Sequence, residues 1–523
     1  MPVPSTPVSR RHALGMAAVG GATLALPLLS GCGDSDDDTA AARGDAGGRP
    51  RRGGTLTSAF TGGGPTESLD PYSPSSPADY ARNRLIYDVL FWAANGKVNP
   101  GLALSAATTD DGSSFILKVR GDVVWHDGSP FGAEDVAFTL RYATSPDRQY
   151  PSELTGYIDA AKAKVEDDHT LVVPLRRPIG DPAGLLAAHQ VFVLKNGTAA
   201  FKPGRVMGTG PMKIVDFAPG RASTLRRFED HWDGAPYLDK IIVLSVNEPQ
   251  ARVNAVRAGQ ADFAAGLPYT EAAKLRSGRK SGVRKGAESE RTGFGFILNS
   301  SRPPFDDPRI RRAVRLAVDR KALVDTVFLG YGEVGNDLFG AGAQYYADDL
   351  EPLSRDVDRA RKLLRAASAD GIEVTVRTAE IETGYNASTE LFAEQMKDLG
   401  LKVRPEVVTP AEFFDAKALG SADAVAFAIY GFPLQTIYTR TATRPSLAFG
   451  DQEFKGALTS AMATRQEAER KRAWRQVQSA MHDRGNWVVW GFADTLNLAR
   501  DGVHGVTGRG TAKYPYLGKA WLA

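Results

Sequence analysis

Apolar residues recur along the chain, from residue 53 onward, with the two spacings that distinguish strands from helices. Short apolar or alternating runs predict strands at 53–60, 115–120, 241–246, 372–378, 401–408 and 487–490. Apolar positions three and four residues apart predict helices at 84–90, 133–140, 251–258, 308–318, 356–364, 391–399 and 467–482. The strand–helix–strand order across 372–408 favours an α/β lobe with a right-handed crossover.

The helix predicted from Pro308 carries a cluster of arginines. Asp307 is a candidate N-cap, and Pro308 suits the first helical position because it has no N–H to satisfy. The apolar positions from Ile310 to Val318 form one face, and the arginines lie largely outside it. We therefore expect a solvated face, and not a phosphate site, at Arg311, Arg312, Arg315 and Arg320.

The first 32 residues have the layout of an export signal. Arg10 and Arg11 precede a Gly- and Ala-rich apolar run from Ala13 to Leu29. The run is too short and too Gly-rich for a permanent membrane span, which needs about 20 apolar residues. The paired arginines resemble a bacterial twin-arginine signal, although Ala13 and Gly15 replace the usual Phe and Lys. The general secretory route stays open as the alternative.

Cys32 is the only cysteine of the sequence, and it ends this apolar run. The residues Leu29-Ser30-Gly31-Cys32 resemble the lipobox of bacterial lipoproteins, which implies that Cys32 carries a diacylglyceryl group on the outer face of the cytoplasmic membrane. The alternative is a buried thiol in an ordinary helix. An acidic tract follows at once and offers nothing to bury a thiol. Residues 33–54 contain no apolar residue larger than Ala and are expected to form a flexible tether.

Composition narrows the classes of partner. The chain has 523 residues, enough for more than one domain of about 150 residues. Its formal net charge of +3 argues against nucleic acid or another polyanion as a partner. With Cys32 assigned to lipid, no disulfide is expected, so a hydrophobic core must hold the folded part together.

Several short motifs suggest chemistry that their context disfavours. His126 and Asp127 are neighbours on an extended turn, where adjacent side chains point to opposite faces, so we expect no catalytic dyad. The G-x-G-x-x-G run at 330–335 follows a predicted helix, so Gly330 is interpreted as a helix C-cap and not as part of a dinucleotide loop. The seven histidines show no paired metal-binding spacing, and no G-x-S-x-G sequence is present. We therefore predict no catalytic residue, no metal and no cofactor.

Three longer blocks resemble the family-5 extracellular solute-binding proteins, which are oligopeptide, dipeptide and nickel receptors of ABC importers. The first is W-H-D-G-S-P-F at 125–131 with E-D-V-A-F at 134–138. The second is G-T-G-P-M at 208–212 with H-W-D-G-A-P-Y-L-D-K-I at 231–241. The third and most specific runs from Phe296 to Gly330. Trp125, Met212 and His231 depart from the aromatic residues usual in the family.

The resemblance implies an α/β fold of the periplasmic-binding-protein type II class, with two lobes, discontinuous domains and a hinge. We expect an export signal with lipobox at 1–32, a tether at 33–54, and a discontinuous lobe I at 55–88, 205–290 and 491–523. An accessory subdomain of lobe I is expected at 89–204 and lobe II at 291–490. The implied activity is capture of a peptide or similar small solute for an ABC permease, by a monomer that is not an enzyme. The alternative is an exported hydrolase or scaffold that reuses this fold.

The ligand site can be placed only through the resemblance. In peptide-binding members, an acidic group on a loop of the second lobe meets the ligand ammonium; the corresponding loop here, 428–435, contains no carboxylate. The missing charge is therefore expected from Glu67, Asp70, Glu380 or Glu382. Candidate walls are Tyr72, Tyr385, Tyr430 and Phe432, with packing in the core or on the surface as the alternative for each. Gln435 completes the set of expected ligand-binding residues.

Overall fold

The computed structural model describes residues 48–74, 76–148, 152–276, 282–287, 290–413, 415–444, 447–508 and 514–523. The predicted signal, Cys32 and residues 33–47 of the predicted tether lie outside these ranges. Within them, no helix has both the length and the apolar character needed to cross a membrane.

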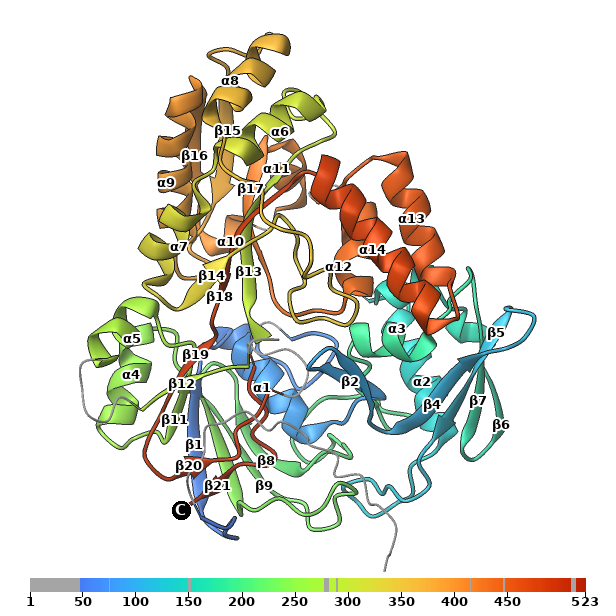
Figure 1. The fold of residues 1–523 in the computed structure, drawn as a ribbon. Coiled ribbons are helices and arrows are strands. Elements are labelled where there is room, and N and C mark those ends of the chain that lie inside the picture. Colours follow the sequence, from blue (N-terminus) through green and yellow to red (C-terminus); the bar gives the residue numbers. More distant parts are fainter. Residues whose placement is uncertain are drawn as a thin grey trace, which may run out of the picture. The chain divides into compact units, whose positions relative to one another are not determined.

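One mixed sheet is assembled from three separate stretches of the chain (Figure 1). Among the described residues it has seven strands in the order β12-β19-β11-β1-β10-β9-β8. The central β1 is parallel to β10 and to β11, whereas β8 and β9 form an antiparallel hairpin. The bounds are β1 (Thr55–Phe60), β8 (Met212–Ala218), β9 (Ala222–Arg227), β10 (Lys240–Ser245), β11 (Phe263–Ala265), β12 (Val283–Lys285) and β19 (Leu496–Ala499). α4 (Pro249–Arg257), α5 (Tyr269–Arg276) and the short pair β20 (Val503–His504) and β21 (Trp521–Leu522) complete this part.

Helix α1 (Pro77–Ile86) packs on this sheet and corrects the helix predicted at 84–90. Ser76 caps its N-terminus by accepting a hydrogen bond from the Asp79 N–H. The helix ends at Ile86, and Tyr87 adopts an extended conformation. The prediction was wrong because the buried positions of α1 include charged groups, such as Arg82, whose guanidinium forms an ion pair with Asp79. A search for apolar periodicity does not detect such a helix.

Residues 91–193 form a second part, built on a four-stranded antiparallel sheet in the order β4-β5-β7-β6. Its elements are the hairpin β2 (Phe91–Ala94) and β3 (Lys97–Pro100), then β4 (Ala103–Thr108), β5 (Ser114–Val119), α2 (Ala133–Thr144), β6 (Lys164–Asp167), β7 (Thr170–Pro174) and α3 (Pro182–Ala188). The buried indole of Trp125 donates to Asp135 on α2 at 3.2 Å, which ties the first family block to the helix that follows it. His126 points elsewhere, with Nε2 donating to the Gly210 carbonyl, while Asp127 pairs with Lys195. No dyad forms, as predicted.

A six-stranded sheet, counted among the described residues, runs in the order β14-β18-β13-β17-β15-β16 (Figure 1). Its strands are β13 (Thr292–Leu298), β14 (Gly332–Val334), β15 (Glu373–Thr378), β16 (Lys402–Val407), β17 (Ala424–Ile429) and β18 (Trp487–Ala493). β15 and β16 are parallel, which confirms the strand–helix–strand prediction. The helices are α6 (Pro308–Ala317), α7 (Arg320–Phe328), α8 (Val357–Ala366), α9 (Tyr385–Met396), α10 (Pro410–Phe413), α11 (Ala416–Ser421), α12 (Leu434–Thr443), α13 (Gln452–Ala463) and α14 (Glu467–Arg484).

Two of the predicted helix starts in this part are confirmed by their caps. Asp307 accepts a hydrogen bond from the Arg309 N–H at the start of α6, and Asp356 caps α8. α9 begins at Tyr385 and not at residue 391, because Gly384 (φ 99°) precedes it and the buried tyrosine already belongs to its core face. α7 ends with Leu329 and Gly330 at positive φ and leads into β14, so the G-x-G-x-x-G run is not a dinucleotide loop.

Two stretches of described residues, the chain passages, lie between the two large sheets in the sequence, one at 286–287 and 290–292 and the other at 493–496. The passages are hydrogen-bonded to each other, because Gly286 N–H donates to the Thr495 carbonyl at 2.8 Å and Thr495 Oγ1 to the Glu290 carbonyl at 3.2 Å. Asp494 also forms ion pairs with Lys285 and Arg291. The predicted boundary between residues 490 and 491 falls inside β18, and the domain boundaries remain predictions.

Residues 90–193 share one hydrophobic core with α12–α14. Polar contacts reinforce it, because Thr436 donates to the Ala188 carbonyl at 2.8 Å and the hydroxyls of Tyr157 and Thr439 lie 2.6 Å apart. α3 lies beside α12, as Figure 1 shows. The second part of the chain is therefore packed against helices that follow the six-stranded sheet in sequence.

Candidate functional site

Two adjoining compartments are lined by the β2–β3 hairpin, by the segment that leads into α12 and by loops from other parts of the chain. The aromatic compartment is lined mainly by Tyr87, Phe91, Trp92, Phe192, Trp232 and Tyr516. The polar compartment is lined by charged, amide and small residues, among them Asn95, Lys97, Glu290, Gln344 and Gln435. Both compartments contact Ala93, Gly431 and Pro433. One bound molecule that passes these three shared residues can therefore place an apolar group and a polar group in different surroundings.

The β2–β3 hairpin supplies one wall. Its tip, Asn95-Gly96, has positive φ at both residues (49° and 68°), which suits the tight turn that joins two antiparallel strands. This turn brings Trp92 to the aromatic compartment and Lys97 to the polar compartment from neighbouring positions of one hairpin. The facing wall is the segment 431–435, which leads into α12.

The carboxylate of Asp88 holds several residues of the second family block through hydrogen bonds. Its Oδ2 accepts hydrogen bonds from Trp232 Nε1 at 2.8 Å, from Thr209 Oγ1 at 3.2 Å and from His231 Nε2 at 3.3 Å. The indole of Trp232 is also covered by the Arg120 guanidinium, 4.3 Å from the ring centroid. These contacts fix the orientation of Trp232 in the aromatic compartment, and they engage the carboxylate of Asp88 with protein donors.

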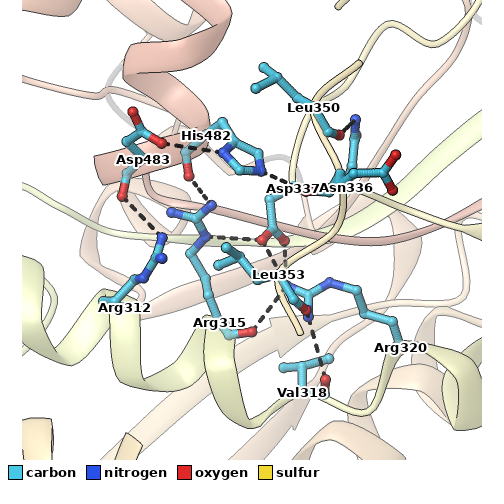
Figure 2. A network of polar contacts seen from close by, with 11 residues as sticks. Arg312, Arg315, Val318, Arg320, Asn336, Asp337, Leu350, Leu353, His482 and Asp483 are labelled. Carbon is cyan, nitrogen blue, oxygen red and sulfur yellow. Dashed lines mark hydrogen bonds and ion pairs between the residues drawn. The ribbon is translucent and has the colours of Figure 1, made fainter. Parts of the chain in front are cut away.

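Arg311 and Arg315 of α6 and Arg320 of α7 are buried, so the prediction of a solvated face was wrong for these three residues. Figure 2 shows that Arg315 and Arg320 converge on Asp337, with nitrogen–oxygen distances of 3.1 and 2.7 Å. Arg315 also donates to the His482 carbonyl, and Arg311 donates to the Phe305 carbonyl. The long stems carry the guanidinium groups from the helix surface to acceptors inside the protein. We call Arg315, Arg320 and Asp337 the arginine clamp.

The arginine clamp holds a loop that reaches the polar compartment. Beside Asp337, the Asn336 amide donates to the Leu350 carbonyl at 2.8 Å, so the two ends of 336–350 are joined (Figure 2). Tyr346 donates to Asn336 at 2.7 Å, and Gln478 accepts from the Ala347 N–H. The middle of this loop presents residues 342–344 to the polar compartment. The clamp is thus a positioning element for one wall of the site.

The candidate residues before α1 lie within the first part of the molecule. Glu67 accepts a hydrogen bond from Ser245 Oγ at 2.6 Å, and Asp70 accepts one from Tyr142 and pairs with Arg148 at 3.1 Å. Tyr72 donates to the Phe192 carbonyl at 2.8 Å. None of these three predicted residues is among those that line the two compartments.

Two further candidates organise the start of α9. The carboxylate of Glu380 accepts hydrogen bonds from the N–H groups of Gly384 and Asn386, at 2.7 and 3.1 Å. Tyr385 is buried and packs edge-on against Phe294, with ring centroids 5.7 Å apart. Neither residue lines a compartment.

The structure brings together the candidates on the loop before α12. Gln435 lines the polar compartment, and Tyr430 and Phe432 flank Gly431, which lines both compartments. The Tyr430 hydroxyl donates to Glu382. Burial and the nearby Glu382 carboxylate raise the pKa of Tyr430 well above its usual value, so the hydroxyl stays protonated as a donor.

Sequence reasoning did not single out Trp92, Lys97, Phe192 or Glu290. The sequence offered one local signal, the Asn95-Gly96 dipeptide, which is typical of the tight turn of a β-hairpin. The tip of such a hairpin is accessible to a binding partner. Glu290 stands next to Arg291 in the sequence, where the pair resembles an ordinary surface ion pair. In the structure Arg291 instead forms ion pairs with Asp494 and Glu333.

Comparison with known proteins agrees with this architecture. Residues 97–447 match the family model described as bacterial extracellular solute-binding proteins, family 5. The glutathione-binding protein GsiB of Salmonella choleraesuis is 24% identical over 446 residues, covering 80% of this chain and 86% of that protein.

Two solved structures illustrate the structural likeness. The ABC transporter-associated periplasmic binding protein DppA from Helicobacter pylori, in complex with the peptide STSA, has a TM-score of 0.75 at 19% identity and covers 90% of this chain and 98% of its own. NikA from Brucella suis, in complex with Fe(III)-EDTA, has a TM-score of 0.77 at 18% identity, covering 90% and 100%. At these identities the likeness shows the fold, which is the predicted α/β fold of type II periplasmic binding proteins.

Proposed function

Because this chain belongs to the bacterial extracellular solute-binding proteins of family 5, we propose that it captures a peptide or similar small solute and delivers it to the permease of an ABC importer. The observation that carries this proposal is the pair of compartments lined jointly by the β2–β3 hairpin, the 431–435 segment and the passage at Glu290. A ligand held there contacts residues on both sides of the two chain passages. Its binding free energy therefore favours the closed arrangement over an open one.

The two compartments favour a peptide-like ligand over a purely apolar or a highly charged one. Aromatic side chains can accept an apolar side chain, and the polar compartment offers an anionic, a cationic and three amide side chains. The Helicobacter pylori structure named above holds a peptide, and the Salmonella relative is a glutathione-binding protein. Both ligands contain peptide bonds, which supports the same ligand class for this chain.

The proposal includes attachment to the membrane through lipid at Cys32. A diacylglyceryl group anchors a protein far more firmly than one acyl chain, and the residues up to 54 act as a tether. The receptor is then held at high local concentration near its permease. We expect Cys32→Ala to move the protein from the membrane fraction to the soluble exported fraction, measured by fractionation and immunoblotting, with Ser30→Ala as control. A Cys32→Ala protein that stays in membranes contradicts the anchor.

The capture function is tested by identifying what the protein carries. Native mass spectrometry of the purified protein should detect a bound solute, and titration calorimetry with that solute should show saturable binding of one molecule. The solute recovered afterwards should be chemically unchanged. Consumption of the solute would favour the exported hydrolase, and a protein that neither carries nor binds any solute would favour the scaffold.

A further inference from the structure

Glu290 is a buried carboxylate with one oxygen that has no hydrogen-bond partner among the described residues. The residue is 7% exposed. Its Oε2 accepts a hydrogen bond from the Ala287 N–H at 2.8 Å, whereas Oε1 is fully buried and accepts none. A carboxylate removed from water in this way is unfavourable unless a cation or several donors compensate it.

The nearby positive charges that the structure describes do not provide this compensation. Arg84 of α1 is close enough for its charge to lower the pKa of Glu290, but burial has the larger effect and raises it. The Nη1 of Arg84 donates to the Tyr514 carbonyl at 2.9 Å, and no ion pair joins Arg84 to Glu290. Lys97, which lines the same compartment, is exposed to solvent and forms no ion pair with Glu290 either.

The uncompensated oxygen lies at the wall of the polar compartment. Gly508 lines this compartment, and a Cβ built on Gly508 would lie only 0.9 Å from Oε1 of Glu290. A Cβ built on Gly286, which does not line the compartment, would instead lie 2.7 Å from Oε2. The Cβ position of Gly508 also lies 2.7 Å from Oε2, so the carboxylate of Glu290, a residue that itself lines the polar compartment, packs against Gly508.

We propose that Glu290 binds a primary ammonium group of the ligand, and that the aromatic compartment takes the apolar group carried near that ammonium. The assignment rests on the proposed capture function and specifies its ligand. An ammonium group brings the positive charge and the N–H donors that Oε1 lacks. Ala93, Gly431 and Pro433 border both compartments, so the ammonium and the apolar group belong to one small molecule.

This ammonium chemistry has two sources, the amino terminus of a peptide and the amine of a non-peptide molecule. The test therefore uses two sets of probes with the intact protein. The first set is the dipeptides Leu-Ala, Ala-Leu, Phe-Ala and Ala-Phe, each with a free and an acetylated amino terminus. The second set is phenethylamine, hexylamine and spermidine. Dissociation constants are measured by titration calorimetry after removal of any co-purified solute.

We expect acetylation of the best dipeptide to weaken its binding to the wild-type protein at least tenfold. Glu290→Gln should weaken binding of the free dipeptide at least tenfold, and binding of its acetylated form less than threefold. A residue that only supported the fold would weaken both forms alike. Glu271→Gln is the matched control, because Glu271 is 8% exposed, pairs with Lys274 and lines neither compartment; it should change neither affinity.

Gly508→Ala provides a second variant that keeps the charge. Its methyl group meets the flexible end of the Glu290 side chain, which can turn away, so the protein should fold while the ammonium position is blocked. We expect the same selective loss of free-dipeptide binding. Equal losses for free and acetylated dipeptides in both variants would overturn the assignment.

The remaining outcomes separate the inference from the function on which it rests. Equal binding of free and acetylated dipeptides by the wild-type protein overturns the role of Glu290 and leaves peptide capture intact. Binding of amines but not of dipeptides supports the role of Glu290 and removes peptides as the ligand class. Binding of no probe overturns the inference, and the solute found by native mass spectrometry then decides the capture function separately.

Discussion

Asp337 and Glu290 are both buried carboxylates in segments that form the polar compartment, but their surroundings differ. Asp337 is fully buried and both of its oxygens accept hydrogen bonds from arginine. Among the described residues, Glu290 has a single backbone donor on one oxygen and none on the other. A buried charge whose partners all belong to the chain stabilises one conformation. A buried charge that lacks a partner favours binding of a ligand that carries the opposite charge.

The largest effect that the comparison predicts is on stability. We expect Asp337→Asn to lower the free energy of unfolding by about 3–5 kcal/mol, because two buried guanidinium groups then lose their shared anion. Urea unfolding followed by circular dichroism measures this change. Asp325→Asn is the control, since Asp325 and its partner Lys321 are 60% and 76% exposed, and it should change stability by less than about 0.5 kcal/mol. A loss below about 1 kcal/mol for Asp337→Asn contradicts the structural role of the clamp.

An intermediate effect is expected for two variants of one tyrosine beside the compartments. Tyr430→Ala should weaken binding of the best dipeptide about tenfold, or about 1.4 kcal/mol, because Tyr430 adjoins Gly431, one of the three residues that both compartments share. Tyr430→Phe, which keeps the ring, should have a smaller effect. Both variants should unfold at nearly the wild-type temperature in differential scanning calorimetry. Wild-type affinity in Tyr430→Ala would remove this residue from the site.

The smallest effect concerns pH and ligand-free stability. Burial raises the pKa of Glu290 above the ordinary value of 4.5, against the opposing influence of Arg84 and the Ala287 N–H. A raised pKa in the folded state gives a stabilising contribution that is present below pH 4.5 and is lost as pH rises through the folded-state pKa. Wild-type protein should therefore lose stability relative to Glu290→Gln as pH rises from 4.5 toward neutrality.

Denaturant titrations of the two ligand-free proteins at several pH values measure this difference. The saturating free dipeptide should cancel the loss, because its ammonium stabilises the charged carboxylate. A stability difference that does not change with pH would show that Glu290 titrates at its ordinary value, against the environment described here.

Features encoded by neighbouring residues could be predicted from the sequence. Asp307 and Pro308 mark the start of α6, and the alternation around 372–378 marks β15, because caps and periodicity depend on residues a few positions apart. The arginine clamp could not be predicted, since Asp337 follows Arg315 by 22 residues and lies beyond another helix. Glu290 was missed for the same reason, because its lack of a partner depends on where Gly508 and Arg84 come to lie. Tyr430 and Gln435 were placed near the site by the family resemblance and not by their own chemistry.

Because residues 90–193 and α12–α14 share an apolar core, the heat-capacity change of ligand binding reports whether closure moves them relative to each other. If an open form separates these two parts, apolar surface meets water and the heat capacity of the open form is the higher one. Closure on a ligand then has a negative heat-capacity change, and its enthalpy becomes more favourable as the temperature rises. If residues 90–193 instead move together with α12–α14, this contribution is absent. Calorimetric titrations at several temperatures thus report which segments of the chain travel as one body when a solute is captured.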